Sequence, residues 1–157
     1  MRKAKLLQFI CPTGFYGAER WILALARHLD NSAVECVLAV TRESGQPSLE
    51  ICSRYEAIGF RTLEIPMSNP FDVMAVSRLR DVIRNEAINI VHTHGYKSDI
   101  IGWLAAKWGG AKIISTPHGF GVEPGMKLAL YMKLGCWMLR WFDAVAPLST
   151  ELHSEIY

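Results

Sequence analysis

Three histidines occupy positions from which their side chains could do chemistry: His92 and His94, separated by one residue, and His118 in a Pro-His-Gly segment. Residues two apart in an extended strand point to the same face, so the imidazoles of His92 and His94 would be neighbours. One interpretation is a metal site with His118 as the third ligand. Asp99 and Glu123 are the only acidic residues nearby and no cysteine is adjacent. Histidines packed against loops, or in contact with a ligand, are therefore the favoured alternatives.

His118 is the best candidate for a functional role. An imidazole at the end of a strand titrates near neutral pH, and the glycine that follows it, Gly119, lets a substrate approach the backbone closely. The alternative is a turn histidine that makes a local hydrogen bond.

The segment 11–20, Cys-Pro-Thr-Gly-Phe-Tyr-Gly-Ala-Glu-Arg, joins an apolar run of strand length to a stretch with helical spacing. A glycine loop at the start of a helix leaves N–H groups unpaired at the positive end of the helix dipole, and Gly14 and Gly17 would let an anion reach them. The spacing matches neither a dinucleotide fingerprint nor a P-loop, so an ordinary strand-to-helix turn is the alternative. Glu19 is expected to cap the helix, and Arg20 to pair with a phosphate or a surface carboxylate.

The elements that must position these residues alternate along the chain. The predicted strands are 6–10, 34–40, 61–65 (an edge strand ended by Pro66), 88–92, 111–116 and 144–146, and the predicted helices are 17–29, 48–58 (closed by Gly59), 71–85, 98–108, 126–142 and one capped by Ser149. This alternation indicates an α/β fold, a doubly wound parallel sheet with helices on both faces. Ligands bind at the carboxyl edge of such sheets, and that edge would carry residues 13–17, 92–95 and 116–120.

Length and composition limit the classes of protein. With 157 residues, 50% of them hydrophobic and 20% charged, the chain has room for one globular domain over residues 1–157. A net charge of +2 is too small to indicate a nucleic-acid partner. Four scattered cysteines, a short apolar run near Met1 and the lack of a long apolar span indicate a cytoplasmic protein in a reducing compartment.

The segment 126–142 is apolar around most of a helix but carries Lys127, Lys133 and Arg140. Three cations are costly in a wholly buried helix, so part of this helix would meet a second domain, a partner or, with its aromatic and basic residues, a membrane surface. A core helix with snorkelling lysines is the alternative.

Four ordered segments, 12–20, 90–95, 116–119 and 144–149, resemble in order and spacing the N-terminal domain of retaining GT-B glycosyltransferases, the group-one or family 4 type that uses nucleotide-activated sugars. The resemblance implies one Rossmann-like half of a two-domain enzyme whose active site lies in the cleft between the halves. The C-terminal half, which binds the nucleotide sugar in the family, is absent from these 157 residues. The isolated chain is therefore expected to fold but to transfer no sugar.

The resemblance also assigns residues to the donor. In the family the first glycine loop approaches the donor diphosphate, a role that falls here on Gly14 and Gly17 with Tyr16, which stands where the family often has another glycine. Glu19 and Arg20 match the motif and would support the loop. The donor would be a nucleotide-diphosphate sugar, and no metal or other cofactor is expected.

On the acceptor side, His118 corresponds to the histidine that lies near the transferred sugar, and it is the candidate catalytic residue. His94, Gly95 and Gly119 correspond to loops that border the acceptor site. The reaction implied is transfer of a sugar to a hydroxyl of a glycan or lipid-linked acceptor in cell-envelope polysaccharide synthesis, with retained anomeric configuration. The leaving phosphate would accept the proton, so catalysis would rest on electrostatic stabilisation and alignment rather than on paired carboxylates. The partners would be the missing domain, the acceptor and, through Met126 to Phe142, a membrane.

Two other functions stay open at this stage. One is a non-catalytic α/β module that binds a sugar or a phosphorylated ligand. The other is a metal hydrolase that uses His92, His94 and His118.

Overall fold

Strands and helices alternate along the part of the chain that the computed structural model describes, residues 3–118 and 126–156. The strands are β1 (Ala4–Ile10), β2 (Val34–Glu43), β3 (Arg61–Met67), β4 (Ile90–Thr93), β5 (Lys112–Ser115) and β6 (Ala144–Val145). The helices are α1 (Gly17–His28), α2 (Glu50–Ala57), α3 (Met74–Asn85), α4 (Tyr96–Gly109), α5 (Met126–Met138) and α6 (Thr150–Ile156), with a 3₁₀ turn at Leu139–Trp141.

These strands form one parallel sheet in the order β3-β2-β1-β4-β5-β6. The chain runs outward from β1 to β3, crosses back to β4 beside β1, and then continues outward to β6. The predicted doubly wound α/β sheet is therefore confirmed. Strand order reverses between β1 and β4, which is where ligands bind in sheets of this kind.

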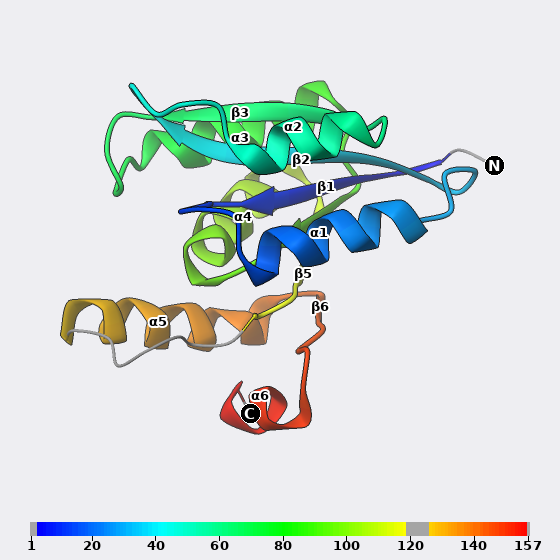
Figure 1. Ribbon diagram of the computed structural model, residues 1–157. Helices are drawn as coiled ribbons and strands as arrows, with labels where there is room; N and C mark the ends of the chain where they lie inside the picture. The colour runs from blue at the N-terminus through cyan, green and yellow to red at the C-terminus, as the bar shows by residue number, and fades with distance from the viewer. Residues whose placement is uncertain (1–2, 119–125, 157) are drawn as a thin grey trace.

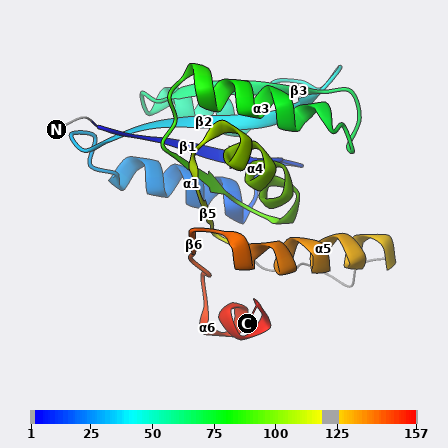
Figure 2. The same cartoon turned by 180° about the vertical axis from the view of Figure 1, so that it is seen from behind.

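Helices cover both faces of the sheet, with α1 and α2 on one face and α3 and α4 on the other (Figures 1 and 2). Successive residues of β1 point to opposite faces. Leu6 and Ile10 accordingly belong to one buried apolar cluster, which includes residues of α1 and α2. Leu7 and Phe9 belong to a second cluster with residues of α3 and α4. Gln8 shares the α1 face with Leu6 and Ile10, so it is a buried polar side chain in an otherwise apolar row.

Several element boundaries differ from the prediction; for example, β2 runs on to Glu43 and α3 begins at Met74 rather than at residue 71. Three of the differences have a clear physical reason. β3 continues through Pro66, because a strand at the edge of a sheet has one neighbour and tolerates the missing N–H. α4 begins at Tyr96 rather than Ser98, because Gly95 adopts φ 113° and turns the chain directly from β4 into the helix. α5 ends at Met138, where the chain tightens into the 3₁₀ turn.

Several predicted helix ends are confirmed by their hydrogen bonds. The carboxylate of Glu19 accepts a hydrogen bond from the backbone N–H of Tyr16 at 2.8 Å and so caps α1. The hydroxyl of Ser149 accepts one from the N–H of Leu152 at 3.2 Å, at the start of α6. Gly59, after α2, has the left-handed φ of 87° that was expected there.

Of the C-terminal elements, α5 lies beside α4. α5 packs against α4, and its Gly135 faces Tyr96 at the start of that helix. Within residues 3–118 and 126–156, no helix combines the length and the apolar character needed to cross a membrane. The four cysteines are free thiols.

Candidate functional site

A pocket of about 830 Å³ opens at the carboxyl edge of the sheet. Its walls come from the loop after β1, the first turn of α1, the end of β2, the first turn of α4, His118 and Leu148. The predicted meeting of the three polar segments at one edge is confirmed for residues 13–17, 92–95 and 116–118. Residues 119 and 120 lie outside the described part of the chain.

Two helices begin at the wall of this pocket, α1 at Gly17 and α4 at Tyr96. The first N–H groups of a helix have no partner within the helix and carry the positive end of its dipole. Lys97 adds a cation to the same wall. The arrangement favours an anion, such as a phosphate group, between the two helix ends.

The histidines form a compact cluster beside this pocket. The ring centres of His92 and His94 are 4.4 Å apart, because both residues point to the same face of β4 as predicted, and those of His94 and His118 are 5.4 Å apart. Trp21 of α1 packs against all three rings, with its ring centre 5.4 to 5.7 Å from theirs. His94 and His118 also line the pocket.

Hydrogen bonds fix the orientation of each histidine ring. His92 Nε2 lies 2.8 Å from the hydroxyl of Thr116. His94 Nε2 lies 2.5 Å from the side-chain oxygen of Gln8, and His94 Nδ1 lies 3.2 Å from His118 Nε2. Four ring nitrogens of the cluster are therefore committed to these hydrogen bonds.

Burial determines the charge of the cluster. It lowers the pKa of His92 to about 4, holds the pKa of His94 well below its ordinary value of 6.5, and lowers the pKa of His118. The neighbouring histidines lower the pKa of His92 and His94 further. The neutral form of each ring therefore predominates at pH 7.

The arrangement gives no support to the metal interpretation. In the described ranges 3–118 and 126–156, no three side chains of His, Cys, Asp or Glu are placed to share a metal ion. The thiol of Cys11 also lines the pocket, but burial raises its pKa to about 11. Cys11 is therefore protonated and a poor nucleophile at neutral pH.

A second polar group is buried behind the pocket, on the α4 face of the sheet. Asp99, in the first turn of α4, accepts hydrogen bonds from the hydroxyls of Thr93 and Ser115, the second at 2.8 Å. Burial raises the pKa of this carboxyl to about 7, although both hydroxyls act in the opposite direction. Asp99 joins the ends of β4 and β5 to the helix that forms one wall of the pocket.

The structure brings most of the predicted site residues together. The pocket is lined by Tyr16, Gly17, Glu19, His94, Gly95 and His118. Gly14 is covered by the ring of Tyr16, which an added Cβ would strike. Gly119 is among the residues that are not described.

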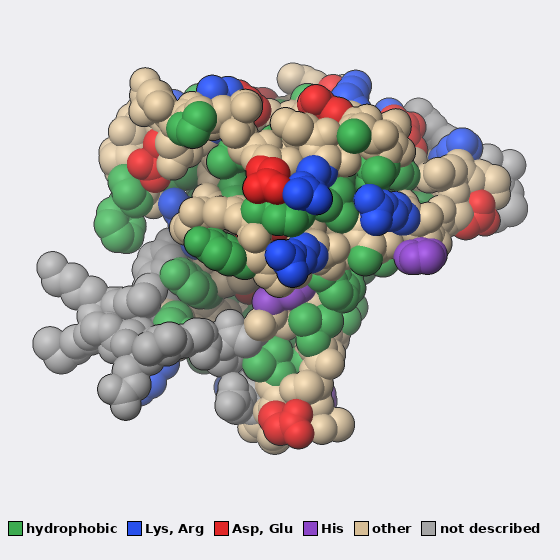
Figure 3. All heavy atoms as spheres, in the orientation of Figure 1, with side chains coloured by type: hydrophobic (Ala, Val, Ile, Leu, Met, Phe, Trp, Pro, Cys, Tyr) green, Lys and Arg blue, Asp and Glu red, His purple; other side chains and the backbone are tan. Residues whose placement is uncertain are grey.

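Arg20 faces a different pocket. It lines a hollow of about 450 Å³ on the outer face of α1 and α2, together with Phe15, Arg27 and Arg54. The guanidinium groups of Arg20 and Arg54 lie 5.9 and 4.6 Å from the centre of the Phe15 ring. Figure 3 shows Lys and Arg side chains gathered over these two helices. A contact between Arg20 and a phosphate would thus occur outside the histidine pocket.

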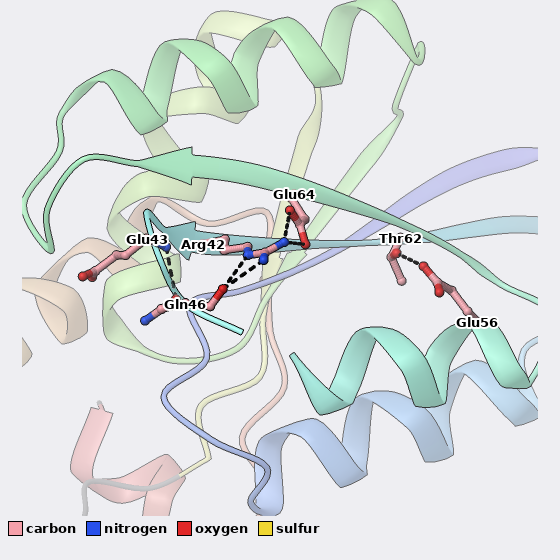
Figure 4. A network of polar contacts seen from close by, with 6 residues as sticks. All are labelled: Arg42, Glu43, Gln46, Glu56, Thr62 and Glu64. Carbon is pink, nitrogen blue, oxygen red and sulfur yellow. Dashed lines mark hydrogen bonds and ion pairs between the residues drawn. The ribbon is translucent and has the colours of Figure 1, made fainter. Parts of the chain in front are cut away.

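The end of β2 forms part of the pocket wall, which was not predicted from the sequence. Arg42 donates hydrogen bonds to the carboxylate of Glu64 and to the backbone oxygen of Gln46, and the side-chain oxygen of Gln46 accepts one from the N–H of Glu43 (Figure 4). The carboxylate of Glu43 points away from this network. Glu43 and Gln46 line the pocket, where they could bind hydroxyl groups.

Gln8 and Trp21 are the other site residues that sequence reasoning missed. Gln8 gave a readable signal, because it interrupts an apolar strand and a buried amide requires a hydrogen-bond partner. Trp21 gave none, since its position on the apolar stripe of α1 also suits an ordinary core residue.

Known proteins are similar to this chain in sequence and in fold. A family model described as Glycosyltransferase Family 4 matches residues 15–156. Over 121 residues, 74% of this chain, the sequence is 26% identical to the UDP-Gal:alpha-D-GlcNAc-diphosphoundecaprenol alpha-1,3-galactosyltransferase of Escherichia coli, of which the match covers 30%.

Among solved structures, HepE of Anabaena in complex with UDP superposes with a TM-score of 0.76 at 10% identity, over 97% of this chain and 40% of that one. A glycosyltransferase from Rickettsia africae gives a TM-score of 0.71 at 22% identity, over 99% of this chain and 39% of that one. At these identities the similarity establishes the fold. The chain spans less than half the length of each of these three proteins.

Proposed function

Because the chain belongs to glycosyltransferase family 4 and has the fold of a GT-B N-terminal domain, we propose that it is the acceptor-side half of a two-domain retaining enzyme. This enzyme would transfer a sugar from a nucleotide-diphosphate sugar to a hydroxyl group. The observation that carries the proposal is the pocket at the switch between β1 and β4, where two helix N-termini and a neutral histidine cluster meet.

The geometry suits this chemistry. Departure of a nucleoside diphosphate places negative charge beside the N–H groups at Gly17 and Tyr96, which are oriented before the reaction begins. His118 lies on the same wall and would contact the transferred sugar. A nucleotide-sugar donor is also supported by the UDP bound to HepE. Transfer without a metal cofactor is part of the proposal.

A lipid-linked acceptor is the acceptor class that we propose. The Escherichia coli relative is named for a sugar acceptor attached to diphosphoundecaprenol. An enzyme acting on such a lipid works at a membrane surface, and the segment Met126 to Phe142 would supply the contact. In its described part, Trp137 and Trp141 are 53% and 44% exposed, next to the exposed cations Lys133 and Arg140.

Vesicle flotation tests the membrane contact. The full-length protein should float with vesicles of anionic phospholipid, and a variant with Trp137→Ser and Trp141→Ser should not. Phe71→Ser, at an exposed aromatic residue outside this segment, is the matched control and should float like the parent protein. Failure of the parent protein to float would rule out the proposed contact.

The enzymatic proposal is tested with the full-length protein and a panel of labelled nucleotide sugars. His118→Ala should reduce transfer by about tenfold or more, because it removes a side chain from the reacting site. His28→Ala, at an exposed histidine of α1, should transfer at the parental rate. Equal rates for the parent and His118→Ala would contradict the proposal, as would turnover by the 157-residue chain alone, which should fold but transfer no sugar.

A further inference from the structure

The position of Gln8 is energetically unfavourable for a polar side chain. It lies in the middle of β1, fully buried, between Leu6 and Ile10 on the apolar α1 face. A buried side-chain amide destabilises a protein unless it is hydrogen-bonded. Its oxygen lies 2.5 Å from His94 Nε2. Its nitrogen makes no well-formed hydrogen bond to a described residue, and its neighbour is the thiol of Cys36, a weak acceptor. The contact with His94 is therefore the interaction that this amide is placed to make.

The bond to Gln8 determines which nitrogen of His94 carries the proton. A side-chain amide oxygen can only accept a hydrogen bond, so His94 Nε2 must be the donor. His94 is deeply buried and neutral, which leaves a lone pair on its Nδ1. This lone pair faces His118 Nε2 at 3.2 Å. His118 Nε2 must then donate, and the proton of a neutral His118 is fixed on that nitrogen.

We propose that Gln8 is a positioning residue that acts through His94 to hold His118 in its Nε2–H form, so that His118 Nδ1 accepts a hydrogen bond from a substrate hydroxyl. The functional half of this inference rests on the proposed sugar transfer. A lone-pair nitrogen accepts a hydrogen bond from a hydroxyl but offers no donor to a phosphate oxygen. The pocket is divided accordingly, with hydroxyl recognition at His118 and diphosphate recognition at the helix N-termini.

In the opposite orientation of the Gln8 amide, donor and acceptor would be exchanged in each of these hydrogen bonds. The amide would donate to His94 Nε2, His94 Nδ1 would donate to His118 Nε2, and His118 would carry its proton on Nδ1. His118 would then present a donor, suited to a phosphate oxygen. The two arrangements predict different tautomers of His94 and His118, which are directly measurable.

Long-range ¹H–¹⁵N correlation spectra of the ¹⁵N-labelled protein at pH 7.5 distinguish the tautomers. The parent protein should show both His94 and His118 as neutral Nε2–H rings. In Gln8→Leu, which removes the acceptor, the Nδ1–H form of His118 should become detectable, because a buried His94 Nε2–H without an acceptor is unfavourable. Thr116→Val, the matched control, removes only the partner of His92 and should leave His94 and His118 unchanged.

An Nδ1–H or doubly protonated His118 in the parent protein would overturn the inference. So would a single Nε2–H form of His118 retained in a folded Gln8→Leu variant. The parental spectrum decides between the tautomers even where Gln8→Leu does not fold. No substrate is present in the measurement, so its outcome is separate from that of the proposed function. Correct tautomers in a full-length protein that transfers no sugar would refute the sugar transfer and leave the hydrogen-bond chain intact.

Discussion

Replacing Asp99 by asparagine should stabilise the protein, by an amount that grows with pH. Asp99 is buried and accepts hydrogen bonds from Thr93 and Ser115. Burial raises the pKa of its carboxyl from 3.8 to about 7. Between pH 3.8 and pH 7, Asp99 is therefore protonated in the folded protein but ionised in the unfolded chain. The stability of the parent protein therefore falls as pH rises from 3.8 to 7, and it is constant above pH 7 as far as this group is concerned.

The size of the effect follows from the difference in pKa. One pH unit corresponds to about 1.4 kcal/mol, so ionisation of Asp99 costs about 4 kcal/mol across the whole interval and about 3 kcal/mol between pH 5 and 7. Asparagine does not ionise, and its side-chain oxygen can accept the same two hydrogen bonds. The difference in unfolding free energy between Asp99→Asn and the parent should therefore increase in favour of the variant by about 3 kcal/mol from pH 5 to 7.

Urea unfolding followed by circular dichroism at pH 5, 6, 7 and 8 measures this difference. The histidines titrate in both proteins, so their contribution cancels. Asp81→Asn, at an exposed carboxylate of α3, is the matched control and should show no such trend. Asp72→Asn should lose stability at neutral pH, because Arg78 and two backbone N–H groups hold the pKa of Asp72 below its ordinary value. A difference for Asp99→Asn that is flat with pH, or that falls, would refute the reasoning.

Three further predictions concern single residues of the site. Gly17→Ala adds a methyl group that meets no atom within 4 Å at a residue without a positive φ, so stability should be unchanged or rise by about 0.4–1 kcal/mol. Transfer by the full-length enzyme should nevertheless fall by about tenfold or more if the diphosphate approaches this residue, and parental activity would exclude that contact. Gly95→Ala should lower the unfolding free energy by about 1–3 kcal/mol despite open space around it, because φ is 113°; an unchanged melting temperature would contradict this. Between pH 6.5 and 4 the unfolded chain binds a proton that His92, with a pKa of about 4, does not bind in the folded protein. The parent should therefore lose about 3 kcal/mol relative to His92→Asn over that interval of acidification, and parallel curves would show that His92 is not neutral when folded.

The arrangement of the sheet was predictable because each strand and each helix has a recognisable local sequence pattern. Apolar runs, glycine caps and the carboxylate of Glu19 fix the elements, and the alternation of strands with helices leaves a doubly wound sheet as the natural solution. The boundary at Pro66 was predicted wrongly, although the same segment was correctly expected to be an edge strand. A proline ends a central strand but is tolerated at an edge, and the tolerance depends on the absence of a second neighbour.

The site could be predicted only in part, since sequence locates an edge but not the direction of each side chain. His92 and His94 were paired correctly because alternation along a strand is a fixed rule. Arg20 and Glu19 are adjacent in sequence, yet they face different pockets because consecutive residues point about 100° apart around a helix. The contact between Gln8 and His94 joins residues 86 positions apart, and no local pattern specifies it.

The two edge strands of the sheet, β3 and β6, limit how this domain can pair with other chains. On one side β3 contains Pro66, which has no N–H to offer, and its Glu64 side chain is paired with Arg42. On the other side β6 has two residues. Both borders are poor templates for β-augmentation or for edge-to-edge aggregation. In the proposed two-domain enzyme, the second domain would therefore dock through loops and helix ends rather than by extending this sheet.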